Sequence, residues 1–101
     1  MLDKFKQAYE LQKKAKEIQK ILKNTEIEAK SADLKVSIVL TADQKIRSIE
    51  IDESLMRPEM KKELEEKLVR VMSEGLSRVQ AVAAGKTKDL MGDLGINLPG
   101  M

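Results

Sequence analysis

The spacing of apolar residues changes twice along this chain, and this change limits the fold more than any other feature of the sequence. Apolar side chains recur every three or four residues over 1–24, every second residue over 26–52, and again at helical spacing over 58–91. A period near 3.6 is typical of an amphipathic helix, and a period of two is typical of a half-buried strand. The sequence therefore predicts a helix, a strand region and a second helix.

The first helix is predicted over residues 1–24, where neither glycine nor proline interrupts the pattern. Asn24-Thr25 is a suitable stop, since asparagine tolerates the left-handed conformation that is common just past a helix end. The apolar positions follow the alternating spacing of a heptad seam. They are Ala8, Leu11, Ala15, Ile18 and Leu22.

The second helix is predicted to begin at Pro58-Glu59, because proline suits the first helical turn and an early acid suits the helix dipole. We expect it to run to about Met91. Gly75 and Gly85 each weaken it by about 1 kcal/mol relative to alanine, so each marks a close approach, a bend or a fraying end. Residues 92–101 hold three of the five glycines and form a predicted tail after a single domain of residues 1–91.

The strand region is predicted to form a three-stranded antiparallel meander, with a turn at Ala42-Asp43-Gln44. Together with the two helices it gives an α+β fold of the order α-β-β-β-α, in which the helices must cover the apolar face of the sheet. A monomer of 101 residues buries only about two-thirds of its unfolded surface. A core that is completed by a second copy of the chain therefore fits best.

The sequence contains no cysteine and no histidine. Thiolate nucleophiles, Cys/His zinc sites, disulfides and imidazole bases are thereby excluded. The best remaining constellation is Glu50, Asp52 and Glu53, which we interpret as the polar face of a strand and the cap of the next helix. We therefore predict no enzyme, no metal, no cofactor and no small-molecule substrate. No window approaches the apolar length of a membrane span, so we expect a soluble cytoplasmic protein without a membrane partner.

The net charge of +2 hides an uneven distribution: residues 1–24 carry seven basic and three acidic side chains, whereas residues 25–56 carry four and seven. Five lysines of the first helix, here called the lysine stripe, lie away from the apolar seam: Lys6, Lys13, Lys16, Lys20 and Lys23. Such a stripe can follow a phosphate backbone. A solvated helix surface is the commoner role of such lysines, and Glu10 and Glu17 lie within one turn of some of them. Near the end of the second helix, Arg78, Lys86 and Lys88 have only Asp89 close by.

Several segments, in this order and spacing, resemble the YbaB/EbfC family of nucleoid-associated proteins, and together they cover nearly the whole chain. They include the lysine- and glutamine-rich first helix and Leu64 to Leu68 of the second helix. Residues 34–55 end in Ile51-Asp52-Glu53-Ser54-Leu55, where the family has an Ile-Asp-Pro-Ser-Leu-like run. Residues 90–94 and the closing Asn97-Leu98-Pro99-Gly100-Met101 are similar to its C-terminal signature. Two departures are that residues 28–33 replace the family's glycine-rich stretch and that Ala42-Asp43 replaces its Asn-Gly turn.

The resemblance implies a tweezer-like homodimer that is joined through its sheets and binds double-stranded DNA with its terminal helices. For this chain, the DNA contacts would map to the lysine stripe and to the basic end at Arg78, Lys86 and Lys88. The sheet residues that we assign to the dimer interface are Val36, Ile38, Leu40, Ile49 and Ile51.

Our hypothesis is a homodimeric, nucleoid-associated protein that holds duplex DNA by phosphate contacts and affects nucleoid organisation or gene expression. The alternative is a homodimeric interaction scaffold whose helical arms grip a protein client through the seam from Ala8 to Leu22. Failure to retard duplex DNA at about 50 mM salt, where counterion-driven binding is strong, would favour the scaffold.

Overall fold

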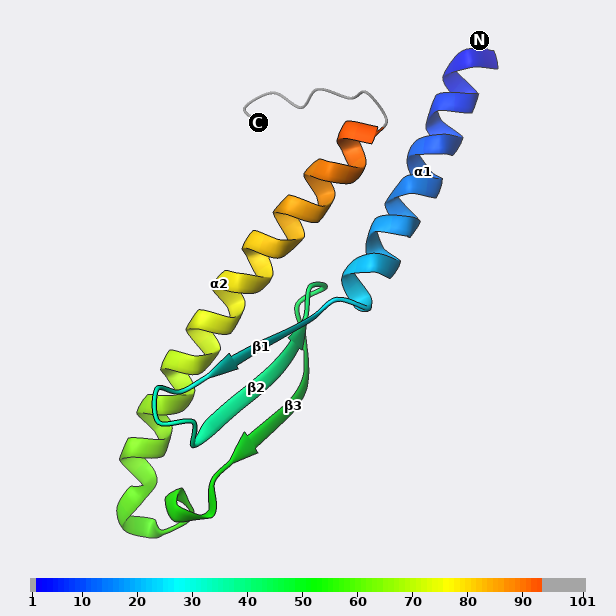
Figure 1. The fold of residues 1–101 in the computed structure, drawn as a ribbon. Coiled ribbons are helices and arrows are strands. Elements are labelled where there is room, and N and C mark those ends of the chain that lie inside the picture. Colours follow the sequence, from blue (N-terminus) through cyan, green and yellow to red (C-terminus); the bar gives the residue numbers. More distant parts are fainter. Residues whose placement is uncertain (1, 94–101) are drawn as a thin grey trace.

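The computed structural model describes residues 2–93 and has the predicted α+β order (Figure 1). The elements are α1 (Leu2–Lys23), β1 (Glu26–Lys30), β2 (Val36–Thr41), β3 (Lys45–Ile51), two 3₁₀ turns (Glu53–Leu55 and Pro58–Met60) and α2 (Lys61–Asp93). The predicted stop at Asn24-Thr25 is confirmed. The predicted start at Pro58 forms a 3₁₀ turn that leads directly into α2. The helix runs through Asp93, two residues beyond its predicted end, and the rest of the predicted tail lies outside the described residues.

The molecule is elongated, with principal extents of 67 × 24 × 16 Å. The first half of α2 lies along the sheet, and its second half continues beyond the sheet on the side where α1 also projects (Figure 1). α1 and the second half of α2 therefore project from the same end of a small body that consists of the sheet and the first half of α2.

The sheet is an antiparallel meander in the order β1-β2-β3. Ile38, in the central strand, lies opposite Ala29 of β1 and Ile49 of β3. A bulge between Val39 and Leu40 shifts the register of β3, so that Leu40 lies opposite Ile46. Directly opposed residues share a face. The bulge therefore places Ile46 and Ile49, three residues apart, on the same face as Ile38.

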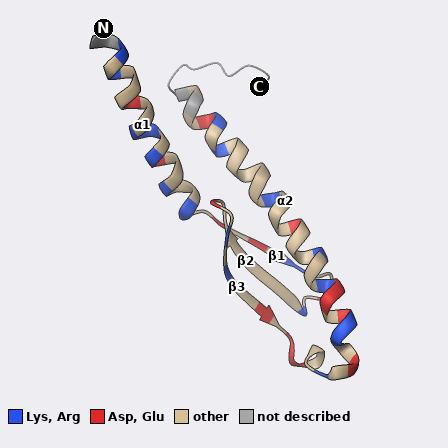
Figure 2. Ribbon diagram, turned by 180° about the vertical axis from the view of Figure 1, so that it is seen from behind, with Lys and Arg blue, Asp and Glu red and all other residues tan. Residues whose placement is uncertain are grey.

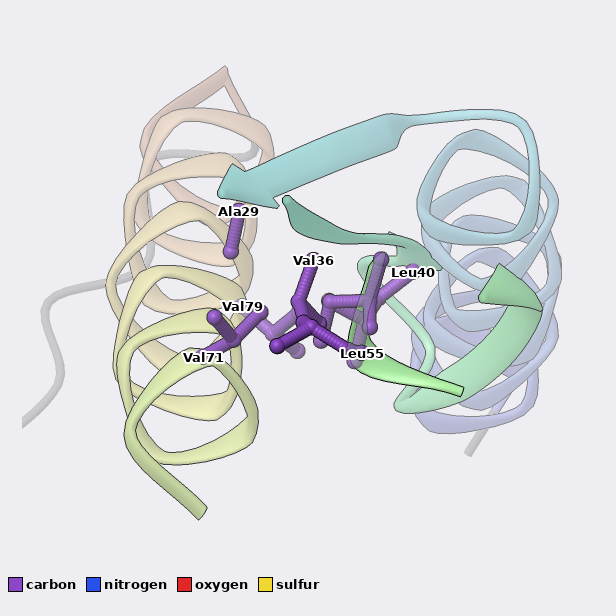
Figure 3. Packing of buried hydrophobic residues seen from close by; sticks show 7 residues of the cluster. Ala29, Val36, Leu40, Leu55, Val71 and Val79 are labelled. Atoms are coloured by element: carbon purple, nitrogen blue, oxygen red, sulfur yellow. The ribbon is translucent and has the colours of Figure 1, made fainter. Parts of the chain in front are cut away.

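The core lies between α2 and the sheet face formed by β1 and β2 (Figure 3). Val71, Gly75 and Val79 follow one another at four-residue spacing, which places them on one side of the helix, and all three are buried. The buried cluster comprises Ala29, Val36, Ile38, Leu40, Leu55, Val71 and Val79. It is a single-chain core, made before any partner is added.

Gly75 is the point of closest approach between α2 and the sheet. A Cβ at this position would lie 2.7 Å from Leu40 Cδ1 and 3.0 Å from Ile38 Cδ1, closer than van der Waals contact allows. Gly85 has no neighbour within 4 Å of the same position. Of the three roles predicted for these glycines, a close approach is therefore confirmed at Gly75, and Gly85 serves no such purpose.

Two tight turns place residues other than glycine in the left-handed region. Leu34, before β2, has φ of 63°, and Gln44, before β3, has φ of 68°. Each of them directly follows one of the two segments, residues 28–33 and Ala42-Asp43, in which the sequence departs from the pattern of the family that it resembles. The left-handed conformation costs roughly 1–2 kcal/mol for a residue with a side chain, so both turns are held by the hydrogen bonds around them.

The turn before β2 is held by Asp33. Its Oδ1 accepts hydrogen bonds from the Ser31 hydroxyl at 2.7 Å and from the Lys35 N–H at 3.1 Å, and its Oδ2 lies 2.7 Å from Lys67 Nζ of α2. The Lys67 ammonium and these hydrogen bonds hold the pKa of Asp33 well below its usual range. The same contact raises the pKa of Lys67. Asp33 thus connects the β1–β2 turn to α2.

We expect Gly75→Val to lower the free energy of unfolding by about 1–3 kcal/mol relative to Gly85→Val, since overpacking a core costs that much. Valine has the same helix propensity at both positions, so the difference isolates the contact with Leu40 and Ile38. Urea unfolding followed by circular dichroism measures it. Equal stability of the two variants would contradict a close approach at Gly75.

We expect Asp33→Asn to destabilise the fold at pH 7, and the difference from wild type to shrink as the pH falls below about 4. The pKa of Asp33 is lowered in the folded state. Its stabilisation is therefore present above the pKa of the unfolded chain, about 3.9, and is lost as the pH falls towards the folded value. Urea unfolding at several pH values measures this, with Glu59→Gln as the control. A difference that does not change with pH would contradict the ion pair.

Candidate nucleic-acid interface

The five residues of the lysine stripe are all exposed on α1. Figure 2 shows the Lys and Arg positions of this helix in blue. The opposite side of the helix carries Ile18, which is only 9% exposed. This arrangement follows from the helical period, because seven residues make nearly two turns and return a side chain to the same side. The structure therefore brings together one continuous basic surface along α1.

The acids of α1 neutralise this surface less than the spacing predicts. Glu17 lies within one turn of Lys13 and Lys20, but its Oε2 lies 3.3 Å from Nζ of Lys14, which is not part of the stripe. Among the side chains that the structure describes, residues 4–90 and 92, the ion pairs that we find leave all five lysines of the stripe without a carboxylate partner.

An open cavity of about 660 Å³ lies where the end of α1 meets the turn between β2 and β3. Three of its lysines belong to the stripe, and Lys45 comes from the first position of β3. Asp43 contributes its acidic side chain, and Ala83 reaches the cavity from α2. The lining residues are Lys16, Gln19, Lys20, Leu22, Lys23, Ala42, Asp43, Gln44, Lys45 and Ala83.

Hydrogen bonds fix the β2–β3 turn against the end of α1. The Ala42 N–H donates to the Thr25 carbonyl at 2.9 Å, and the Thr25 hydroxyl donates to the Ile21 carbonyl at 2.6 Å. Within the turn, the Thr41 hydroxyl donates to the Asp43 carboxylate. The position of Lys45 relative to α1 is therefore set by the backbone.

The predicted basic end of the second helix does not form one surface. Arg78 donates a hydrogen bond to the Glu28 carbonyl at 2.8 Å and pairs with Glu74 at 2.6 Å. Lys86 and Lys88 are exposed. They are two positions apart, and side chains at this separation on a helix point about 160° away from each other. Arg78 thus connects α2 to β1, and the two lysines face in different directions.

The contact of Arg78 also blocks one edge of the sheet. The backbones of Thr25 and Ser31 hydrogen-bond to those of Ala42 and Val36, at the two ends of β2. In an antiparallel pair, every second residue points its backbone groups at the neighbouring strand, and the residues between point theirs outward. Glu28 is one of the residues between, so its carbonyl lies on the free edge of β1. Arg78 satisfies it there.

The structure places three of the residues predicted for the dimer interface in the core of the single chain. Val36, Ile38 and Leu40 have no exposed surface, because α2 of the same chain covers them. A side chain with nothing exposed has no surface to bury against a partner, and these three residues are core residues. Ile51 is half-buried and packs against that core, whereas Ile49 is 48% exposed.

The exposed apolar surface of the sheet lies instead on β3. Ile46 is 47% exposed, and it shares a face with Ile49 through the bulge. We call these two residues the β3 margin. The backbone N–H and C=O of Ile49 point away from β2, because the adjacent positions, such as Ser48 and Glu50, make the bonds to it. The β3 margin thus combines apolar side chains with an outer strand edge.

The carboxylates near the end of β3 have a structural role. Asp52 caps the following 3₁₀ turn by accepting a hydrogen bond from the Ser54 N–H at 2.9 Å, which lowers the pKa of Asp52. The predicted cap is thereby confirmed. Within residues 2–93, no cluster of three or more acidic side chains is arranged to hold a metal ion. None of the helices described is long and apolar enough to cross a membrane.

Sequence reasoning missed Lys45. The sequence marks it only as the residue after a predicted turn, and its proximity to α1 depends on how the hairpin packs against the end of that helix. The sequence held one signal that could have drawn attention to Lys45. Residues 25–56 carry more acidic than basic side chains, and Lys45 is one of only four basic residues in this region.

The fold and the basic helix surface are those of a small α+β protein with a candidate DNA-binding surface. The sequence model of the YbaB/EbfC DNA-binding family matches residues 1–94 of the chain. Among curated relatives, a nucleoid-associated protein of Afipia carboxidovorans is 33% identical over 99% of this chain and 93% of its own length. A nucleoid-associated protein of Bradyrhizobium diazoefficiens is 35% identical over 94% of this chain and 90% of its own. The chain therefore belongs to the YbaB/EbfC DNA-binding family.

A solved structure supports the fold independently. An uncharacterized protein from Helicobacter pylori superimposes with a TM-score of 0.75, covering 83% of this chain and 88% of that one, at 19% sequence identity. At this identity the similarity concerns the fold alone.

Proposed function

We propose that this protein is a homodimeric nucleoid-associated protein of the cytoplasm that binds double-stranded DNA, largely through phosphate contacts and without catalysis. The observation that carries the proposal is the lysine stripe, a row of five exposed lysines on α1 without carboxylate partners among the described residues. The names of the curated relatives, nucleoid-associated proteins, support the same cellular role.

The spacing of the stripe suits a phosphate backbone. Lys6, Lys13 and Lys20 are seven residues apart, which is about 10.5 Å along a helix. One DNA strand carries a phosphate about every 3.4 Å of duplex axis. Phosphates are therefore spaced more closely than these lysines, so several lysines of an α1 helix that lies against the backbone can each reach a phosphate. Backbone contacts of this kind carry no sequence information, so we expect little sequence preference.

The β3 margin supports dimerisation. An unpaired outer strand with exposed apolar side chains is a template for pairing with another chain. Of the two sheet edges, β1 carries Arg78 on its outer carbonyl, whereas β3 presents Ile46 and Ile49. Two copies that join at β3 would form a continuous sheet, bury both margins and place two lysine stripes on one molecule. From the predicted interface, Ile49 and Ile51 remain in this proposal, and Ile46 is added.

We expect the double substitution Lys16→Glu and Lys23→Glu to weaken binding to unrelated duplexes by similar factors. The salt slope should become flatter by roughly one unit for each phosphate that the protein no longer neutralises. Fluorescence anisotropy with labelled duplexes at several salt concentrations measures both quantities. Lys61→Glu with Lys62→Glu, at the far end of α2, makes the same change in net charge and should have a much smaller effect.

Unchanged duplex retention by the α1 variant at low salt would remove α1 from the interface. A wild-type protein that retards no duplex at about 50 mM salt would overturn DNA binding and favour the protein-interaction scaffold.

We expect Ile49→Glu to convert the dimer to a monomer, because a charge on an outer strand opposes edge-to-edge pairing. Sedimentation equilibrium measures the mass, and circular dichroism checks that the variant is folded. Leu34→Glu is the matched control, since Leu34 is also exposed but lies on the β1–β2 turn. A dimer that survives Ile49→Glu would place the interface elsewhere.

A further inference from the structure

We propose that the cavity between α1 and the β2–β3 turn is a phosphate clamp, and that Lys45 contacts the DNA backbone together with Lys16, Lys20 and Lys23. This inference rests on the proposed function and extends the interface from the helix to the sheet. Its occupant is a backbone phosphate of duplex DNA.

The charges around the cavity favour an anion. Four of its ten lining residues are lysines, and Asp43 is the one acid among them. None of the four lysines pairs with a carboxylate in the part of the chain that the structure describes. The Asp43 carboxylate accepts a hydrogen bond from Thr41 and so is held at the turn. The cavity therefore has an excess of positive charge without an internal counterion for each lysine.

The lining can supply more than charge. Gln19 and Gln44 also line the cavity, and a side-chain amide can donate hydrogen bonds to phosphate oxygens. The apolar side chains of Leu22, Ala42 and Ala83 complete the lining. An apolar backing lowers the local dielectric and strengthens the attraction between an ammonium group and a phosphate.

The clamp is preformed by the backbone. The hydrogen bond from the Ala42 N–H to the Thr25 carbonyl holds the turn beside the last residues of α1. Lys45 follows Gln44, whose left-handed backbone sends the chain from the turn into β3. Because backbone hydrogen bonds already hold the turn beside the end of α1, the main cost of binding a phosphate is the ordering of the lysine side chains.

The cavity is continuous with the lysine stripe, since Lys16, Lys20 and Lys23 belong to both. Lys16 and Lys20 are one turn apart, and Lys23 is one turn further on, so the three point to the same side of α1. A DNA strand that follows the stripe towards the sheet therefore reaches the cavity, where Lys45 adds a contact from a different element. This continuity identifies the phosphate as one of the DNA backbone.

The test compares three charge variants in duplex binding. Lys45→Gln should weaken binding roughly tenfold at about 50 mM salt, because one lysine no longer neutralises a phosphate. Asp43→Asn should tighten binding, because it removes the acid from the cavity and keeps an oxygen that can accept from Thr41. Lys62→Gln, with the same charge change as Lys45→Gln but on the far end of α2, should leave the affinity unchanged. Thermal unfolding confirms that each variant is folded.

Amide chemical shifts locate the anion directly in the full-length protein. Titration with inorganic tripolyphosphate, and separately with a short duplex, should move the signals of Ala42 to Lys45 and of the last two turns of α1. In Lys45→Gln these movements should be reduced.

Two results would overturn the inference, and they are distinguishable. If wild type binds duplex DNA but Lys45→Gln behaves like Lys62→Gln and the signals of 42–45 do not move, the clamp is wrong and the proposed function stands. If wild type binds no duplex while tripolyphosphate still moves these signals, the proposed function falls, and with it the assignment of DNA as the occupant.

Discussion

The close approach of α2 to the sheet at Gly75 is the constraint on which the rest of the structure depends. With no side chain at this position, the helix packs directly on Ile38 and Leu40 and covers β1 and β2. The body of the molecule is thereby closed by one helix. α1 is left to project from the end of the sheet, and β3 is left with an uncovered margin. The basic surface and the apolar margin both follow from this division of the two helices.

The two helices use their charged residues differently. On α2, Lys67 and Arg78 bind groups of the β1–β2 turn, of β1 and of α2 itself. Those side chains hold the fold together. On α1, the stripe lysines have no such partners among the side chains that the structure describes. The small net charge of the chain therefore conceals a basic arm attached to a body in which Lys67 and Arg78 are used in internal contacts.

The sequence was sufficient for the element order, because each element repeats its pattern over several turns or residues. The stripe on α1 was equally predictable, since it depends only on helical geometry. The sequence could not predict which surface covers the sheet. Alternation shows that Val36, Ile38 and Leu40 are buried, but it does not show whether a helix of the same chain or a second chain buries them. Arg78 and Lys45 show the same limit of the sequence. Arg78 was predicted to contact DNA, but its side chain binds the Glu28 carbonyl of the sheet. Lys45 was not predicted as a site residue, but the β2–β3 hairpin brings it close to α1.

The bulge in β3 has a consequence for how this strand can change. Arg47 is the extra residue between Ile46, opposite Leu40, and Ser48, opposite Val39. In a regular strand, residues three positions apart point to opposite faces, so Ile46 and Ile49 share a face only because of this extra residue. Deleting Arg47 would restore strict alternation and leave the two isoleucines two positions apart, again on one face. The apolar margin would therefore survive the loss of the bulge by deletion, whereas pairing that became regular with Arg47 still present would divide the margin between the two sides of the sheet.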